Sequence, residues 1–328
     1  MKNTNKVLQF LGIPYTALLS VLLGLFLVSF PMGIFVVFDT EIGKDVNYEL
    51  PLSHLDLFSS AEFYQSDFPI SLGDAFVVLW LFYLIIFSIA LLGPKSNFLK
   101  SLSPIISFGN FDSKFNYMIG VTKWFSILIL VSAVIAFVQE GLGISITPPT
   151  STNDLTQFFY VSLAPLLEEF GFRIILLGIP LFALYSQKSS IGYFFKCLWN
   201  PTQLKIYDYK KAILLIVFIA VLFGFAHIAF VDSWSEGKFA QATAGGLILG
   251  WVYVRYGFIV CLLIHWATNY FIFSYANFIS QVNSIAIEDA FNHSLMSSIE
   301  ILFLAAGIVS VVVLFANRFL KSDKHLEV

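Results

Sequence analysis

Long apolar stretches recur along this chain, and they constrain its fold more than any other feature. A helix needs roughly 20 apolar residues to cross the hydrocarbon core of a membrane. About eight segments of the chain reach or approach that length. The sequence therefore predicts an all-α, polytopic membrane bundle of about eight transmembrane helices. The predicted spans are Tyr15–Phe38, Ile70–Leu92, Met118–Val138, Phe158–Phe182, Ala212–Val231, Phe239–Val254, Gly257–Tyr275 and Met296–Ala316.

The composition agrees with a membrane protein and argues against several other classes. Of the 328 residues, 58% are hydrophobic and 12% are charged, whereas a soluble chain carries about 25% charged residues. No basic cluster stands out, so we expect no nucleic-acid partner. Cys197 and Cys261 form neither a disulfide framework nor a zinc-binding spacing. No linker or low-complexity tract interrupts the chain, so we expect residues 1–328 to form one transmembrane domain in the lipid bilayer.

The basic residues fall almost entirely in every second loop between the predicted spans. Of the 18 Lys and Arg, only Lys44 and Lys238 lie in the alternate loops, and Arg173 lies deep inside a predicted span. The positive-inside rule then predicts that the basic loops and both termini face the cytoplasm of the cell membrane. The largest basic loop, residues 187–211, contains Phe194, Phe195 and Trp199 among its lysines. It is either an interfacial helix or a plain connection with anchoring aromatic side chains.

Two adjacent carboxylates and a guanidinium lie inside the predicted span Phe158–Phe182. Each residue of an α-helix advances by about 100°, so Glu169 and Arg173 share a face and are spaced to form an ion pair. Glu168 points about 100° away from Glu169 and has no partner in this segment. Ionisable groups within a membrane cost at least about 2.5–3.5 kcal/mol each and usually mark function. We therefore predict a structural role for the Glu169–Arg173 pair and a chemical role for Glu168.

Two further predicted spans carry polar residues at helical spacing. His227 follows Phe223 by four residues, and His265 precedes Asn269 by four. A single histidine in a membrane helix usually serves as a hydrogen-bonding residue between helices. Two histidines and a carboxamide, together with the unpaired Glu168, instead predict a polar cavity near the middle of the membrane.

These residues also carry a resemblance to a known family. The sets Glu168-Glu169-x-x-x-Arg173, Phe223-x-x-x-His227 and His265-x-x-x-Asn269 resemble the three motifs of the CAAX-protease and bacteriocin-processing family, also called CPBP or Abi. The resemblance covers about residues 158–275, and the family's fold of about eight membrane helices agrees with the number of predicted spans. It implies an intramembrane endopeptidase that acts on a membrane-embedded, prenylated or leader-peptide substrate.

The residues suit that reaction chemically. Glu168, partly desolvated, is suited to act as the general base that activates a water together with His227. His265 and Asn269 can donate hydrogen bonds to the oxyanion of the tetrahedral intermediate. Glu169, bonded to Arg173, is expected to hold its helix in register.

Three alternatives stay open at this point. Zinc could be bound by Glu168, His227 and His265, because a catalytic zinc usually takes three protein ligands. We favour a mechanism without a metal cofactor, because we expect Glu169 and Asn269 to be engaged elsewhere and unable to orient the two imidazoles. A proton-coupled transporter would also place Glu, His and Arg at mid-membrane, although the sequence shows no inverted repeat. A non-catalytic membrane scaffold could use the same pocket to bind a partner.

Overall fold

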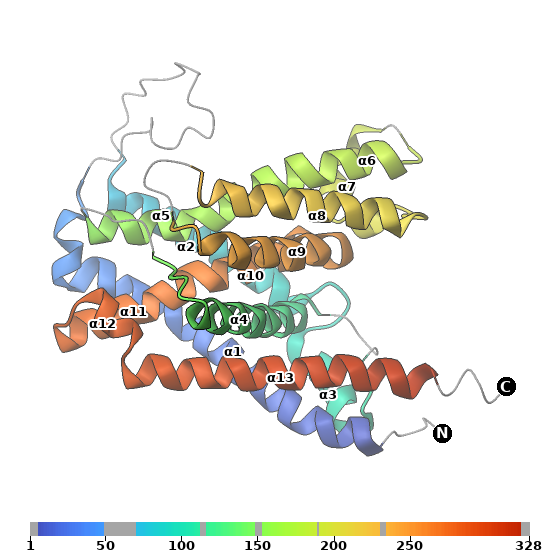
Figure 1. Cartoon of the computed structure of the whole chain (residues 1–328), viewed down its shortest axis with the longest axis horizontal. Helices are drawn as coiled ribbons and strands as arrows, with labels where there is room; N and C mark the ends of the chain where they lie inside the picture. The colour runs from blue at the N-terminus through green and yellow to red at the C-terminus, as the bar shows by residue number, and fades with distance from the viewer. Residues whose placement is uncertain are drawn as a thin grey trace.

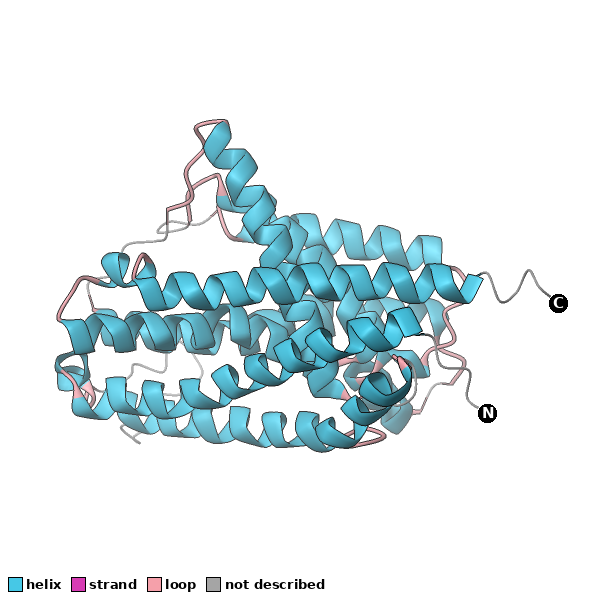
Figure 2. Ribbon diagram, turned by 90° about the horizontal axis from the view of Figure 1, so that it is seen from below, coloured by secondary structure: helices cyan, strands magenta, loops and turns pink. Residues whose placement is uncertain are grey.

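The protein is a helical bundle in this computed structural model, and no β-strand occurs among the residues that the structure describes (Figure 2). Those residues are 6–48, 70–111, 116–147, 153–188, 190–229 and 234–322. The helices are α1 Lys6–Asp39, α2 Leu72–Leu92, α3 Phe98–Phe108, α4 Tyr117–Gly141, α5 Asp154–Glu169, α6 Ile179–Tyr185, α7 Ile191–Trp199, α8 Tyr209–Ala226, α9 Lys238–Tyr256, α10 Phe258–Trp266, α11 Ile272–Asn283, α12 Ile287–Phe291 and α13 Ser294–Ser322. Two π-helical segments join helices without a break: Phe170–Gly178 between α5 and α6, and Ala267–Phe271 between α10 and α11.

Six helical stretches of the described chain are long and apolar enough to cross a membrane. They overlap six of the eight predicted spans. The predicted end of the span Ala212–Val231 is wrong, because α8 ends at Ala226, and the last two residues of that span lie outside the described part of the chain. The other two predicted spans fall on α9 and on the continuous helix formed by α5, its π-helical segment and α6, and these two are not among the six. The physical reason is composition, because the first is rich in Gly and Ala and the second carries the Glu–Arg pair. The basic loop contains a helix, α7, and its position at the membrane interface stays a prediction.

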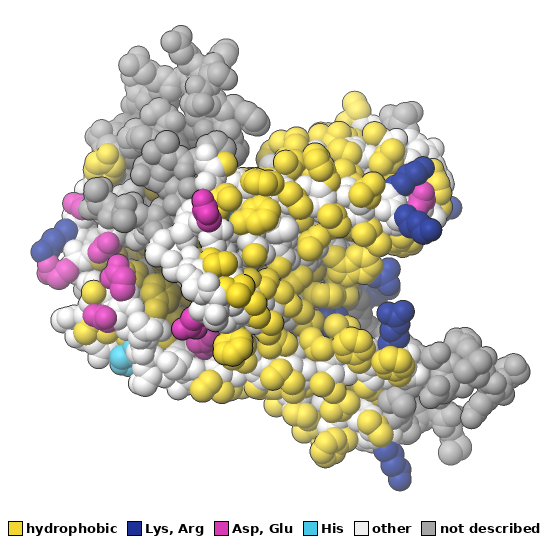
Figure 3. Space-filling model, viewed as in Figure 1, with side chains coloured by type: hydrophobic (Ala, Val, Ile, Leu, Met, Phe, Trp, Pro, Cys, Tyr) yellow, Lys and Arg dark blue, Asp and Glu magenta, His cyan; other side chains and the backbone are white. Residues whose placement is uncertain are grey.

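The arrangement of the bundle agrees with the predicted asymmetry of charge. Helices α8, α9, α4 and α13 run side by side, and α1 crosses behind them (Figure 1). Helix α1 starts and α13 ends at the same end of the molecule. Lys and Arg gather mainly at that end, Asp and Glu gather mainly at the opposite end, and hydrophobic side chains cover the middle (Figure 3).

The core of the bundle is built around the fully buried Trp266, the last residue of α10. Its ring stacks on those of Phe30 and Tyr270, each at a centroid distance of 5.3 Å. Rings from α1 and α2 complete the cluster, and each aromatic pair adds about 0.5–1.5 kcal/mol beyond area burial. These contacts fix the end of α10 directly beside His265. The remaining rings of the cluster are Phe26, Tyr83 and Phe87.

Helices α8 and α9 approach closely along the small-residue stripe of α9. A β-carbon added at Gly246 would lie 3.0 Å from the Cα of Ala220, and one added at Gly250 would lie 2.9 Å from a methyl group of Ile216. Glycine at these positions therefore lets the two backbones come together. This contact places the end of α8, which leads to His227, against α9.

The helices that carry the site begin at recognisable residues. Asn153 caps α5 by accepting a hydrogen bond from the backbone N–H of Thr156 at 2.8 Å, and Asp208 caps α8 in the same way. Gly257 separates α9 from α10 with a φ of 90°, a value that favours glycine. The tight connection at Gly257 lets α10 pack against α9, and the His265 ring contacts the Phe223 ring near the end of α8.

Candidate active site

Three separate segments bring the predicted site residues together. Glu168 and Glu169 end α5, and Arg173 follows in the π-helical segment Phe170–Gly178. His227 is the first residue after α8, and His265 lies in α10. Asn269 lies in the π-helical segment Ala267–Phe271. The convergence that the sequence predicted for these helices is therefore present in the structure.

Glu168 faces both histidines without touching either. Its Oε2 atom is 4.0 Å from His227 Nε2 and 3.8 Å from His265 Nε2, beyond the reach of a direct hydrogen bond. This oxygen is buried and has no hydrogen-bond partner in the described part of the chain, although 30% of the side chain is exposed. A water placed between Glu168 Oε2 and either Nε2 atom would be within hydrogen-bonding distance of both atoms that it joins.

Glu169 is completely buried and is the centre of a polar network. Its Oε2 accepts hydrogen bonds from Arg173 Nε at 3.1 Å and from the Cys261 thiol at 2.7 Å. Its Oε1 lies 2.7 Å from His265 Nδ1. The predicted Glu169–Arg173 ion pair is confirmed. The prediction that Glu169 is unable to orient an imidazole is wrong. Its Oε1 contacts His265, while Oε2 forms the ion pair with Arg173.

The bond from Glu169 sets the tautomer of His265. An ionised carboxylate only accepts hydrogen bonds, so Nδ1 of His265 carries a proton and Nε2 is left facing Glu168. His227 is oriented in the same sense, because its Nδ1 lies 2.8 Å from the backbone oxygen of Phe223, which also only accepts. Both imidazoles therefore present Nε2 to Glu168.

The aromatic ring of Phe223 contacts three residues of the site. The guanidinium carbon of Arg173 lies 4.6 Å from the centre of the Phe223 ring, in the range of a cation–π contact. The ring also packs edge-on against the rings of His227 and His265 at 4.6 and 5.9 Å. The two terminal nitrogens of Arg173 are buried with no acceptor in the described residues. Phe223 and Glu169 together stabilise this buried charge.

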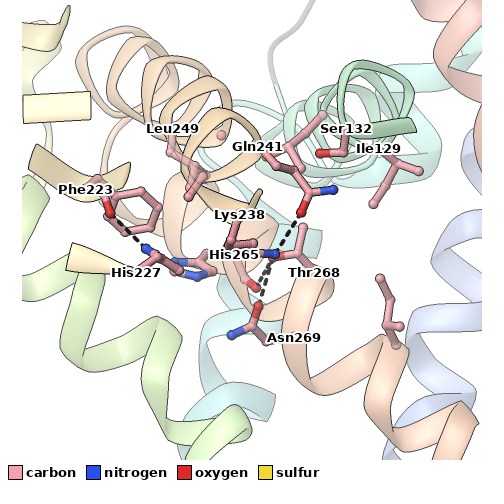
Figure 4. A pocket seen from close by; sticks show the side chains of 14 residues that line it. Ile129, Ser132, Phe223, His227, Lys238, Gln241, Leu249, His265, Thr268 and Asn269 are labelled. Carbon is pink, nitrogen blue, oxygen red and sulfur yellow. Dashed lines mark hydrogen bonds between the residues drawn. The ribbon is translucent and has the colours of Figure 1, made fainter. Parts of the chain in front are cut away.

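A cavity of about 230 Å³ adjoins the histidines (Figure 4). His227, His265 and Asn269 line it, whereas Glu168 is not among the lining residues and faces the cavity only through the two histidines. The Thr268 hydroxyl donates to the backbone oxygen of His265 at 2.7 Å and lies 3.3 Å from Asn269 Oδ1. These contacts hold the amide of Asn269 at the edge of the cavity.

The sequence missed the π-helical segments and three residues of the site. The segments follow directly after Glu169 and Trp266, and π-turns of this kind are frequent at functional sites. Cys261, at 2.7 Å from Glu169, precedes His265 by four residues, and this spacing was the available signal. Lys238 and Gln241 also line the cavity. Lys238 was detectable only as a lone charge beside a predicted span.

The geometry fits a bound water better than a zinc ion. The donor atoms are of a suitable kind, since Glu168, His227 and His265 offer one oxygen and two nitrogens. A tetrahedral zinc with bonds of about 2.0–2.1 Å would bring its ligand atoms to about 3.3 Å from one another, closer than the 3.8 and 4.0 Å found here. No group of three His, Cys, Asp or Glu in the described residues has the spacing of a metal site. These residues therefore do not fit zinc as they stand.

A comparison with known families bears on the same segments. Residues 152–271 match the family described as Type II CAAX prenyl endopeptidase Rce1-like. The matched stretch contains all six predicted site residues. No curated protein and no solved structure matches the chain.

Proposed function

Because residues 152–271 of this chain form a domain of the Rce1-like type II CAAX prenyl endopeptidase family, a family of intramembrane proteases, we propose that the chain hydrolyses a peptide bond of a membrane-associated or lipidated substrate with a water activated by Glu168. The observation that carries the proposal is the position of Glu168 Oε2 at 4.0 and 3.8 Å from the Nε2 atoms of two oriented histidines.

The attacking water is proposed to lie between Glu168 and His227. His227 Nε2 accepts one hydrogen bond from this water, because Nδ1 holds the ring proton against the Phe223 carbonyl. Glu168 takes the other proton as the water oxygen bonds to the scissile carbonyl carbon. When the carbon–nitrogen bond breaks, Glu168 gives this proton to the leaving amine, so the carboxylate is regenerated.

The negative charge that develops on the carbonyl oxygen also needs donors. Asn269 lines the cavity and offers an amide N–H, and such a donor contributes a few kcal/mol to a transition state. His265 Nδ1 already donates to Glu169, so the ring must carry protons on both nitrogens for Nε2 to donate to the same oxygen. Glu169 thus acts as a positioning residue.

The arrangement favours hydrolysis over the two rival functions. A proton-coupled transporter would distribute its polar groups along a path through the membrane. Here one carboxylate and two imidazoles instead meet within 4.0 Å. A scaffold would not require that both histidines be oriented toward the same oxygen.

We propose that the chain also crosses the membrane in the two helical stretches that are less apolar. The continuous helix of α5, its π-helical segment and α6 carries the first motif, and α9 lies between α8 and α4 (Figure 1). With these two, the chain makes eight crossings and places both termini in the cytoplasm of the cell membrane. The whole chain is then one transmembrane domain.

The experiment that tests the function uses purified protein in liposomes. The probe is a farnesylated peptide that ends in a CAAX tail, and mass spectrometry detects its products. Glu168→Gln should lower turnover by about 10²–10⁴-fold, because general-base catalysis is lost, while the unfolding temperature stays unchanged. Glu140→Gln, at an exposed position of α4, is the control and should be fully active.

Undiminished cleavage by Glu168→Gln would contradict the proposal. If Glu168→Gln is inactive, as expected, a comparison of membrane peptides by mass spectrometry between a wild-type strain and a Glu168→Ala strain identifies the natural substrate. Peptides that persist only in the Glu168→Ala strain are the expected candidates.

A further inference from the structure

The cavity beside the two histidines contains a cation that the hydrolysis does not use. Lys238, the first residue of α9, lines this cavity together with His227 and His265. Among the described residues that line it, Lys238 is the one Lys, Arg, Asp or Glu. Its side chain points into the same space as Gln241 and Asn269 (Figure 4).

The ammonium group of Lys238 is held in place by neutral partners. Nζ donates a hydrogen bond to Gln241 Oε1 at 2.8 Å and lies 4.1 Å from the centre of the Trp234 ring. In the described part of the chain, no carboxylate lies within 4.0 Å of this nitrogen. Neutral contacts orient a cation, but they do not neutralise it, and a charge in a confined site gains most from a charged partner.

Hydrogen bonds fix the segment that leads to Lys238, from Trp234 to Gly237, relative to the catalytic site. The backbone N–H of Trp234 donates to the backbone oxygen of His227 at 3.1 Å. The backbone oxygen of Gly237 accepts a bond from Gln139 Nε2 of α4 at 2.8 Å. Lys238 is thus preorganised relative to His227, which is what a substrate-binding group requires.

We propose that Lys238, oriented by Gln241, binds a carboxylate of the peptide substrate and selects substrates that carry one close to the scissile bond. This inference rests on the proposed function. A carboxylate is the anion that peptides supply, and an ammonium group with a satisfied neutral neighbour still has N–H donors for it. The carboxylate comes either from the free C-terminus of the peptide or from an Asp or Glu side chain.

Neither Glu168 nor Glu169 forms an ion pair with Lys238, although the charge of Glu168 acts on Lys238 from beyond 4.0 Å. Glu169 is completely buried and bonded to Arg173, Cys261 and His265. Glu168 faces the two histidines and lies outside the cavity lining. The cavity therefore has a positive group on one wall and no described carboxylate on any wall.

The test compares peptides that differ only in this charge. Three farnesylated CAAX peptides serve as probes: one with a free C-terminal acid, one with a C-terminal amide, and one amide with Glu as its last residue. Wild-type protein should cleave the acid with a kcat/KM at least about tenfold above that of the amide, mainly through KM. If the Glu-containing amide is cleaved as fast as the acid, the site binds any carboxylate. If the Glu-containing amide is cleaved slowly, the site binds only the C-terminal carboxylate.

The variants separate binding from chemistry. Lys238→Met should lower kcat/KM for the acid to the level of the amide and leave the amide within twofold of wild type. Lys238→Arg should keep most of the preference for the acid peptide over the amide peptide. Lys123→Met is the matched control, because Lys123 also lies over aromatic rings but lines another cavity, and its preference should equal that of wild type.

Two results would overturn the inference while hydrolysis by Glu168 still stands. One is equal cleavage of acid and amide by wild-type protein. The other is an equal loss of both activities in Lys238→Met, which indicates a structural role. If no probe is cleaved, the proposed function fails instead, and the unfolding temperature then decides the inference. The carboxylate site is supported if the acid peptide raises the unfolding temperature of wild-type protein, the amide peptide does not, and Lys238→Met abolishes the effect. It is rejected if the acid and amide peptides raise the unfolding temperature equally.

Discussion

Glu168 and Glu169 are adjacent in the sequence but lie in different surroundings. Glu168 is 30% exposed and faces two imidazoles, whereas Glu169 is fully buried and accepts bonds from three side chains. The helical turn of about 100° between neighbours accounts for this separation. One carboxylate is thereby available for proton transfer, and the other is fixed in place.

Removing the charge of Glu169 should therefore destabilise the protein. Glu169→Gln leaves Arg173 buried without its ion partner, a change that costs about 3–5 kcal/mol in comparable buried pairs. It also weakens the contact that orients His265, so turnover should fall as well. Unfolding in detergent measures the first effect, with Glu168→Gln as the adjacent control. A larger loss of stability in Glu168→Gln would reverse the roles of the two carboxylates.

The spacing of the ligand atoms leads to a prediction about metal dependence. The atoms of Glu168, His227 and His265 are 3.8 and 4.0 Å apart, wider than about 3.3 Å in a tetrahedral zinc site. Purified active protein should contain less than stoichiometric zinc and keep its activity in a strong chelator. Metal analysis before and after chelation checks this. Stoichiometric zinc, with activity that chelation removes and zinc alone restores, would make these three residues metal ligands.

At the scale of the helices, the close approach of α8 and α9 positions the second motif. Gly246 lies directly over the backbone of Ala220 in α8, whereas the neighbouring Gly245 has no atom within 4 Å of an added β-carbon. Small residues at such a contact allow main chains to pack closely. The end of α8, and with it His227, depends on this contact.

The two glycines provide a matched pair of substitutions. Gly246→Val should force α8 and α9 apart and destabilise the protein by about 1–3 kcal/mol, as overpacking does. Gly245→Val places the same side chain in open space on the same helix and should leave the unfolding temperature near that of wild type. Thermal unfolding in detergent compares the two. Equal effects would mean that the contact at Gly246 does not control the packing.

For the whole molecule, the distribution of charge and the position of the helix ends support the proposed topology. Helix α1 starts and α13 ends at the end where Lys and Arg gather (Figures 1 and 3). Positively charged ends face the cytoplasm. An even number of crossings is consistent with both observations.

Labelling of single cysteines tests this topology. Both natural cysteines are buried, so the unmodified protein should give a low background. Gln187→Cys, in an exposed loop at the basic end, should react with an impermeant thiol reagent only after the membrane is opened. Glu41→Cys, exposed at the other end, should react in intact cells. Reaction of both positions from the same side would rule out the eight-span topology.

Relations within one helix were predictable from the sequence. The apolar stretches predict the membrane helices, because length and composition decide whether a segment can cross lipid. The Glu169–Arg173 pair and the adjacent placement of Phe223 and His227 follow from the α-helical repeat, and the structure contains both.

Relations between helices were decided only by the tertiary structure. The sequence could not show that Glu169 reaches His265 and Cys261, or that Lys238 lines the same cavity as His227. Such contacts depend on how all the helices pack, and a shift of one or two ångströms decides whether two groups form a bond, share a water or fail to meet. The π-helical segments also lack a sequence signal, because packing selects the wider turn. Local geometry therefore determined which residues could act, and packing determined which atoms face one another.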